Sequence, residues 1–352
     1  MDDAHALGID IGGTQLRTAL IDRRGVVLNR ERHPTPADDP DRLIGALGRV
    51  LSRLPTHLPV GIGIAGLVTP SGIVRYGPNI GVRELPLAEE LQHRTGHHVV
   101  VANDASVAAF GEQRVGAGAG AQDVLLVTIG TGVGGGVVLG GQLVLGTNGF
   151  AGEIGHVLVA RDGRRCPCGN HGCVEAYASG SAIGAIAQER LAEGARSVLH
   201  EAQDLAGPDV SRAAAAGDEL ARSVLTDAGG WLGVALASLV NVLDPQLVLI
   251  GGGAAEAVAP WLLPAAEAQM RELMLGGTHR TPPAIELAAL GDDAGVVGAA
   301  LLAADSVSSS VPDSVLTPDL PASDPSASDP PAPDLPAFDP SASDPSAPTD
   351  RG

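Results

Sequence analysis

The chain has 352 residues, of which 44% are hydrophobic, and 22 Lys+Arg stand against 41 Asp+Glu for a formal net charge of -19. This hydrophobic content can form one large core or two moderate ones, and it excludes disorder throughout the chain. Nucleic acid is not an expected partner, because the chain is acidic and only 2% of its residues are aromatic rings that could stack on bases.

Short apolar runs typical of strands alternate with helical patterns from residue 7 to residue 304. Strands are expected at residues 7–11, 17–22, 60–64, 99–101, 124–129, 136–139 and 247–250. Helices are expected near residues 40–54, 86–95, 105–113, 181–196, 217–243, 260–274 and 294–304. This alternation predicts an α/β protein.

Residues 306–352 differ in composition from the rest of the chain. They are mainly Asp, Pro, Ser and Ala, and Asp recurs every five residues from Asp319 to Asp344. Proline interrupts the hydrogen bonds of helices and sheets and the aspartates repel one another, so this segment cannot bury enough surface to offset the entropy of ordering. We expect a disordered tail that acts either as a solvating appendage or as a docking segment.

The start of the chain and its hydropathy pattern bear on localisation. The first residues, MDD, lack the positively charged start of a secretory signal, and no window of eighteen uncharged apolar residues comes after them. We therefore expect a cytoplasmic protein with no membrane partner.

Two glycine-rich turns are similar in sequence. Residues 7–14 read LGIDIGGT and residues 125–132 read LLVTIGTG, and both are predicted to be a strand, a turn and the start of another strand. In the first turn, Gly12 and Gly13 let the backbone approach a phosphate and Thr14 offers a hydroxyl donor. Two such turns facing each other could bind one polyphosphate through their N–H groups. The alternative is an ordinary hairpin turn.

Residues 61–66 and 130–135 each match the pattern G-x-G-x-x-G. A dinucleotide-binding fingerprint must open a helix, whereas residues 136–145 read as a strand, a turn and another strand. A nicotinamide-dependent oxidoreductase is therefore disfavoured.

Polar or flexible residues come directly after two predicted strands. Asn103 and Asp104 lie between a strand and a helix, at the edge of a parallel sheet where ligands bind, and a helix N-cap is the alternative. Residues 251–253 are three glycines after the strand at 247–250. A flat nucleoside could lie on their backbone, and the alternative is a flexible turn between strand and helix.

Three cysteines, Cys166, Cys168 and Cys173, lie within one short segment. Their clustering and odd number indicate a metal rather than a disulfide in a reducing compartment. Three thiolates and one imidazole form the closed set of a structural zinc site, with His156 or His171 as the fourth ligand. The alternative is three reduced, buried cysteines.

Glu153 and Glu175 flank the cysteine segment. A metal there could hold both carboxylates in place to accept hydrogen bonds from vicinal hydroxyls. The alternative is that both are surface charges, which is the commoner environment of Glu.

Six motifs succeed one another in a definite order. They are DIGGT (10–14), ND (103–104), TIGTGVGGG (128–136), GEIGH (152–156), CPCGNHGCVE (166–175) and DP with GGG (244–253). In this order they resemble the ROK family of bacterial sugar kinases and sugar-responsive repressors, over nearly all of residues 7–304. The stretch 168–180 looks most like the ATP-dependent glucokinase branch.

The resemblance implies an actin-like (ribonuclease H-like) ATPase fold, in which two α/β domains surround a cleft. It assigns residues 1–115 to a small N-terminal domain completed by a C-terminal helix at 294–305, and residues 116–293 to a larger domain with the zinc site. It also implies a homo-oligomer, either a dimer or a tetramer.

The resemblance further implies that ATP phosphorylates the 6-hydroxyl of glucose, with Asp104 as the general base. The sugar-binding residues would be Asn79, Asn103, Asp104, Glu153, His156 and Glu175. The ATP-binding residues would be Asp10, Gly12, Gly13, Thr14, Gly130, Thr131, Gly132, Gly251, Gly252 and Gly253. Zinc would be held by His156, Cys166, Cys168 and Cys173.

The chain contains no lysine, so Mg²⁺, backbone N–H groups and arginine must offset the charge of ATP. Asp10 is the carboxylate expected near that Mg²⁺, through water. Two departures from the family pattern are Gln15, where Lys is usual, and Ala102, where Glu is common. Neither touches the expected chemistry.

Other functions stay open at this point. The same hydroxyl contacts could serve fructose, N-acetylmannosamine or allose, and polyphosphate could replace ATP. A sugar-responsive repressor of the same family is disfavoured, because no helix-turn-helix precedes Asp10 and no basic recognition helix is found.

Overall fold

The computed structural model describes residues 4–37, 39–201 and 205–308. Most of the predicted disordered tail lies outside these residues. Its first three residues are a correction, because they belong to the last helix, α9 (Ala294–Ser308). The hydroxyls of Ser306 and Ser308 donate to the carbonyl oxygens of Ala303 and Ala304, so each serine has a hydrogen-bond partner within the helix.

A mixed five-stranded sheet in the order β3-β2-β1-β4-β8 forms the first part of the fold. Its strands are β1 (Ala6–Ile11), β2 (Gln15–Ile21), β3 (Val27–Pro34), β4 (Val60–Ile64) and β8 (Val99–Asn103). β1 pairs antiparallel with β2 and parallel with β4, which pairs parallel with β8. Helices α1 (Pro40–Leu51) and α2 (Leu87–Thr95) bury their leucines against one face of this sheet.

The second five-stranded sheet repeats this arrangement in the order β11-β10-β9-β12-β13. Its strands are β9 (Val124–Ile129), β10 (Val133–Leu139), β11 (Gln142–Leu143), β12 (Leu247–Gly251) and β13 (Ala284–Leu287). Here too the central strand, β9, pairs antiparallel with the next strand and parallel with β12. The similarity of the two glycine turns therefore extends to the sheets that carry them.

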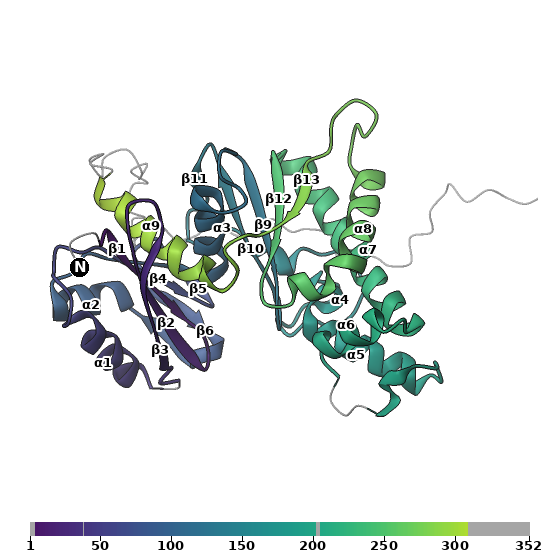
Figure 1. The fold of residues 1–352 in the computed structure, drawn as a ribbon, viewed down its shortest axis with the longest axis horizontal. Helices are drawn as coiled ribbons and strands as arrows, with labels where there is room; N and C mark the ends of the chain where they lie inside the picture. The colour runs from purple at the N-terminus through teal and green to yellow at the C-terminus, as the bar shows by residue number, and fades with distance from the viewer. Residues whose placement is uncertain (1–3, 38, 202–204, 309–352) are drawn as a thin grey trace, which may run out of the picture. The chain divides into compact units, whose positions relative to one another are not determined.

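Helices α3 (Asp104–Val115) and α9 pack against each other and against the sheets (Figure 1). Small residues allow this close approach. A Cβ on Gly8 of β1 would lie 1.8 Å from the carbonyl oxygen of Val296 in α9, so α9 rests directly on the first sheet. A Cβ on Gly136 of β10 would lie 2.6 Å from the Cβ of Ala109 in α3. Helix α3 thus contacts both sheets, and its position is closely constrained.

The remaining helices pack with the second sheet. They are α4 (Glu175–Ala178), α5 (Gly180–Ala192), α6 (Gly207–Ala215), α7 (Glu219–Leu243) and α8 (Ala255–Leu273). In the described part of the chain, α7 is the one helix long and apolar enough to cross a membrane, yet 56% of its most apolar window is buried. That burial is typical of a core helix, as its packing against α8 confirms.

Several elements differ from the sequence expectations. The sequence patterns do not predict strands β3 and β13, the small sheet, or helices α4 and α6. Strand β11 confirms the second strand expected within residues 136–145. The small sheet consists of β5 (Leu67–Val68), β6 (Val74–Gly77) and β7 (Val82–Leu85). Strand β10 begins three residues earlier than expected, because its glycines pack against α3 instead of forming a loop.

Helix α8 begins at Ala255 and not near residue 260. Pro260 and Pro264 both lie inside it, where a proline normally disfavours a helix by removing a backbone donor. Packing of Val258, Leu262 and other residues in the core shared with α7 outweighs that preference.

Candidate active site

A cavity of about 690 Å³ lies between the carboxyl ends of strands from both sheets. Parallel strands end there, so the loops and helices attached to them supply its wall. Of the residues expected to function, it is lined by Asp10, Asp104, Gly130, Thr131, Gly132, Glu175, Gly251, Gly252 and Gly253. The fold thus brings residues from five of the six motifs to one place.

Asp104 is the first residue of α3, and Asn103 is its N-cap. The Oδ1 atom of Asn103 accepts from the Ser106 N–H at 3.0 Å, and its Nδ2 donates to the carbonyl oxygen of Gly66 at 3.2 Å. The N-cap alternative therefore describes Asn103 correctly. One N–H of its amide stays available for a ligand, because the amide carries two.

Asp10 and Asp104 are at the ends of parallel strands β1 and β8, with β4 between them. Burial raises the pKa of Asp10 to about 6, the charge of Asp104 contributes to that rise, and Arg17 opposes both. Burial also raises the pKa of Asp104. Two poorly solvated carboxylates in one cleft favour binding of a cation or a proton donor.

Glu153 precedes the 3-10 turn Ile154–His156. Burial raises the pKa of Glu153, His156 lowers it, and the charges of Asp104 and Glu175 raise it. The charges of Asp104 and Glu175 therefore reach Glu153, although Glu153 and His156 do not line the 690 Å³ cavity itself.

Glu175 contacts the second glycine turn directly. Its Oε2 accepts from the backbone N–H of Val133 at 3.0 Å, and its Oε1 lies 3.7 Å from the Sγ of Cys166. The carboxylate therefore joins the cysteine segment to the turn between β9 and β10. Sequence reasoning missed this contact, which places Glu175 on the side of the cleft formed by the second turn.

The second turn is also bonded to the elements behind it. The N–H of Gly180, at the start of α5, donates to the carbonyl oxygen of Gly130 at 2.8 Å. A second cavity of about 670 Å³ is lined by Gly130, Thr131 and Gly253 in common with the first, together with Ser181 and Gln188. The turn and Gly253 therefore border both cavities.

The first glycine turn has a different environment. Thr35, which comes after β3, donates through its hydroxyl to the carbonyl oxygen of Gly12 at 2.7 Å and through its N–H to that of Thr14 at 3.0 Å. Among the described residues that line the two cavities, none belongs to the turn Gly12-Gly13-Thr14. Phosphate binding by this turn stays a prediction.

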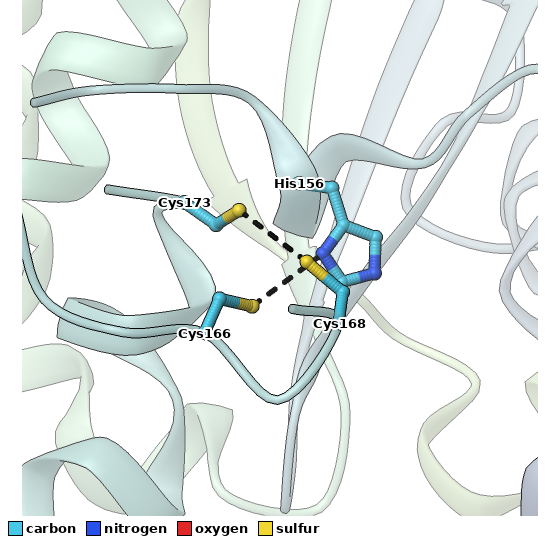
Figure 2. A group of neighbouring side chains, drawn as sticks. All are labelled: His156, Cys166, Cys168 and Cys173. Carbon is cyan, nitrogen blue, oxygen red and sulfur yellow. Dashed lines mark hydrogen bonds between the residues drawn. The ribbon is translucent and has the colours of Figure 1, made fainter. Parts of the chain in front are cut away.

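The ligand atoms of His156, Cys166, Cys168 and Cys173 all lie within 4.8 Å of one another (Figure 2). The Sγ atoms of Cys168 and Cys173 are 3.7 Å apart, and the Sγ of Cys166 is 3.8 Å from the Nδ1 of His156. Tetrahedral ligands at zinc–sulfur distances of about 2.3 Å would be separated by about 3.8 Å. The donor set and its spacing therefore fit Zn²⁺.

His171 does not join this cluster. Its Nδ1 lies 3.2 Å from the carbonyl oxygen of Gly163, and its side chain is exposed. Asn79 lies in the 3-10 turn Pro78–Ile80, and its side chain is outside the described part of the chain, so its sugar-binding role stays a prediction.

Four further charged residues line the 690 Å³ cavity: Arg17, Glu112, Glu256 and Asp292. Arg17 lies opposite Asp10 in the antiparallel pair of β1 and β2. Because the sequence predicts the turn between these strands, the pairing of residues on its two sides could have placed Arg17 beside Asp10. The other three had no local signal, because only the packing of distant segments brings them to the cleft.

A model of the ROK family matches residues 6–306. The chain belongs to the ROK family. A glucokinase of Halalkalibacterium halodurans is 37% identical over an alignment of 316 residues, and the match covers 85% of this chain and 94% of that protein. An N-acetylmannosamine kinase of Escherichia coli is 36% identical over 307 residues, covering 84% of this chain and 97% of that one.

Among solved structures of ROK proteins, the glucokinase from Streptomyces griseus in complex with glucose and AMPPNP matches with a TM-score of 0.73. It is 36% identical to this chain, and the match covers 85% of this chain and 99% of that one. The expected actin-like fold is thereby confirmed for this ROK protein.

Proposed function

We propose that this protein transfers the γ-phosphoryl group of ATP to the 6-hydroxyl of glucose. Sugar kinase is the activity common to the relatives described above, whose sugars differ, and glucose is our choice among them. The observation that carries the proposal is one cavity that joins a glycine turn, the glycine end of β12 and Asp104 at the start of α3.

On the sugar side, we assign the hydroxyl contacts to Asn79, Asn103, Glu153, His156 and Glu175. Carboxylates accept hydrogen bonds from adjacent hydroxyl pairs. The charges of Asp104 and Glu175 raise the pKa of Glu153, which supports the closeness of these three groups. Fructose, N-acetylmannosamine and allose present related hydroxyl sets, so discrimination must come from the particular groups that are left unpaired.

On the nucleotide side, we assign the phosphates to the turns at Gly12-Gly13-Thr14 and Gly130-Thr131-Gly132. The adenosine would lie along Gly251–Gly253 and reach the 670 Å³ cavity, whose lining includes Ser181 and Gln188 as hydrogen-bonding side chains. Mg²⁺ bound with ATP would offset the phosphate charge, and Asp10 is its expected carboxylate, through water.

Asp104 acts as the base in this mechanism. As the 6-oxygen of the sugar forms its bond to the γ-phosphorus, the bond from phosphorus to the bridging oxygen of ADP breaks, and the hydroxyl proton passes to Asp104. Burial raises the pKa of Asp104, which makes its carboxylate a stronger base.

Zinc has a structural role in this proposal. The four protein ligands His156, Cys166, Cys168 and Cys173 complete a tetrahedral set, which leaves no open position for a reacting water.

We also propose cytoplasmic localisation, a homo-oligomer and the domain boundaries given above. Size-exclusion chromatography with light scattering measures the oligomeric state.

The experiment that tests the function is ADP release from the purified full chain across a panel of hexoses, with ATP as donor, and phosphorylation of the same sugars with polyphosphate in its place. We expect the highest kcat/KM with glucose and ATP, and 6-phosphorylated product by NMR. Preference for N-acetylmannosamine would contradict the sugar assignment. Turnover of no sugar, together with retention on DNA at physiological salt, would favour a repressor.

A further inference from the structure

Glu112 is a fully buried acid near the end of α3, the helix that begins with Asp104. Its carboxylate accepts three backbone hydrogen bonds. Oε2 accepts from the N–H of Ala117 at 2.9 Å and from that of Ala289 at 3.0 Å, and Oε1 accepts from the N–H of Leu290 at 2.7 Å. No expected function accounts for this group.

These three donors come from the two connections between the sheets. Residues 116–123 lead from α3 to β9, the first strand of the second sheet, and residues 288–293 lead from β13 back to α9 on the first sheet. Within the described residues, the chain crosses between the five-stranded sheets only through these two segments. One carboxylate therefore bonds both crossings to the helix that carries Asp104.

The chemistry of the group suits this position. A carboxylate offers only acceptors, and each of the three neighbouring donors is a backbone N–H. Hydrogen bonds to an ionised group are stronger and shorter than those between neutral groups, so both crossings are held firmly. An amide of the same size would turn an NH₂ group toward at least one of these N–H groups.

Glu112 also lies in the wall of the 690 Å³ cavity, together with the residues assigned to the reaction. Asp104 is part of α3, the turn Gly130-Thr131-Gly132 joins two strands of the second sheet, and Asp292 belongs to the second crossing. Any rotation of one sheet against the other must occur at the crossings that Glu112 fixes.

We propose that Glu112 is a positioning residue that holds Asp104 and the second glycine turn in register for phosphoryl transfer. The inference rests on the proposed kinase function and adds a residue to it. Without the carboxylate, both crossings gain freedom, and the sugar hydroxyl and the γ-phosphate are less often in line. Each substrate still binds, since every group assigned to contact it is kept.

The test compares Glu112→Gln with a matched control, Gln113→Leu. Gln113 is also buried on α3, and its Nε2 donates to the carbonyl oxygen of Ala121 at 2.8 Å, within the first crossing alone. Both changes remove buried polar contacts from the same helix. Only Glu112→Gln disturbs the bonds to both crossings.

We expect Glu112→Gln to lower kcat by about tenfold or more, since small misplacements of reacting groups are costly. The dissociation constants of the sugar and of an unreactive ATP analogue should change by less than about threefold, which is a small difference in binding free energy. Gln113→Leu should keep kcat within about threefold of the wild-type chain. Activities are measured well below each variant's melting temperature.

Amide exchange resolved to single residues by NMR or fragmentation mass spectrometry separates the inference from the function. In the wild-type chain, the amides of Ala117, Ala289 and Leu290 should be protected, and Glu112→Gln should accelerate the exchange of all three together.

Unprotected amides in the wild-type chain would overturn the inference even if the variant did not fold. An unchanged kcat in folded Glu112→Gln, or an equal loss in Gln113→Leu, would overturn it too. If the wild-type chain phosphorylates no sugar, the proposed function fails, and the positioning inference fails with it even where exchange confirms the bonds.

Discussion

The turns β1–β2 and β9–β10 have similar sequences and occupy the same place in two sheets of the same strand order. Their surroundings differ. In the first sheet, the long strand β3 comes after β2, and Thr35 at its end donates a hydrogen bond to Gly12 in the first turn. In the second sheet, the corresponding strand β11 has two residues, and Glu175 and Gly180 bond to the second turn and its edge. A shared local pattern therefore does not imply a shared role, because the neighbours of each turn depend on the later segments of the chain that pack against it.

The largest effect should come from Asp104, the proposed base that lies opposite the phosphates assigned to both turns. Asp104→Asn is expected to lower kcat by about 10² to 10⁴-fold, because the base is lost while the shape of the side chain is kept. Stopped-time ADP assays measure kcat, and glucose titration measures binding, which should be nearly unchanged. Asp41→Asn, in the exposed first turn of α1, is the control. Near-normal turnover of the Asp104 variant would remove it as the base.

A paired substitution tests whether the turns differ in importance. An added Cβ at Gly132 would lie 2.5 Å from the Oε2 of Glu175, whereas one at Gly12 would lie 3.2 Å from the carbonyl oxygen of Gln15. Gly132→Ala should therefore displace Glu175 from the Val133 N–H. The turn would then lose the hydrogen bond that holds it in place for the phosphates, and we expect the KM for ATP to rise about tenfold.

Gly12→Ala should raise the same KM by less than about threefold. Steady-state kinetics with ATP varied at saturating sugar compare the two variants. An equal effect in both, or a larger one at Gly12, would mean that the first turn contacts phosphate as closely as the second.

Asp10→Asn should separate stability from function at the first turn. The folded-state pKa of Asp10 is about 6, above the ordinary 3.8, so its ionised form opposes folding. The cost is fully present above pH 6 and disappears as the pH falls to about 4, the value in the unfolded chain. Removing the charge should therefore stabilise the chain by about 3 kcal/mol at pH 8 and by well under ~1 kcal/mol at pH 4.

Urea unfolding of the wild-type chain and the Asp10→Asn variant, without ATP, gives this difference at each pH. The same variant should lose activity with Mg²⁺ and ATP. A variant that is less stable than the wild-type chain at pH 8 would contradict the assigned burial penalty.

Metal removal should have the smallest effect of these changes, and it should alter amide exchange in the second glycine turn only. Because Glu175 comes two residues after the proposed zinc ligand Cys173 and accepts from the Val133 N–H, a chelator should accelerate amide exchange in residues 130–133 and leave residues 12–14 unchanged. Restoring Zn²⁺ is the control and should reverse the change. Equal acceleration at both turns would mean that the metal supports the whole fold and not this connection.

Local patterns carry most of the element predictions. Short continuous apolar runs locate β1, β4, β9 and β12, whose side chains are buried on both faces. Patterns are insufficient where tertiary packing opposes local preference. The prolines of α8 indicate a boundary and the glycines that begin β10 indicate a loop, since neither pattern includes the partner helix that packs there.

The candidate site divides in the same way. The short spacing of the three cysteines indicates a metal cluster directly, whereas the choice between His156 and His171 depends on which ring reaches the thiols. Asn103 has two interpretations from sequence; the structure confirms the N-cap, and its contact with a ligand stays a prediction.

The sequence alone determined the fold class, the family resemblance and the kinds of groups at the site, because short-range spacing sets both secondary structure and motif chemistry. Only the tertiary structure decided that Glu175 bonds the second turn, that the first turn is bonded to Thr35, and that Glu112 joins both crossings. Those contacts link residues far apart in the chain, and a carboxylate's role depends on which donors the fold brings within hydrogen-bonding distance.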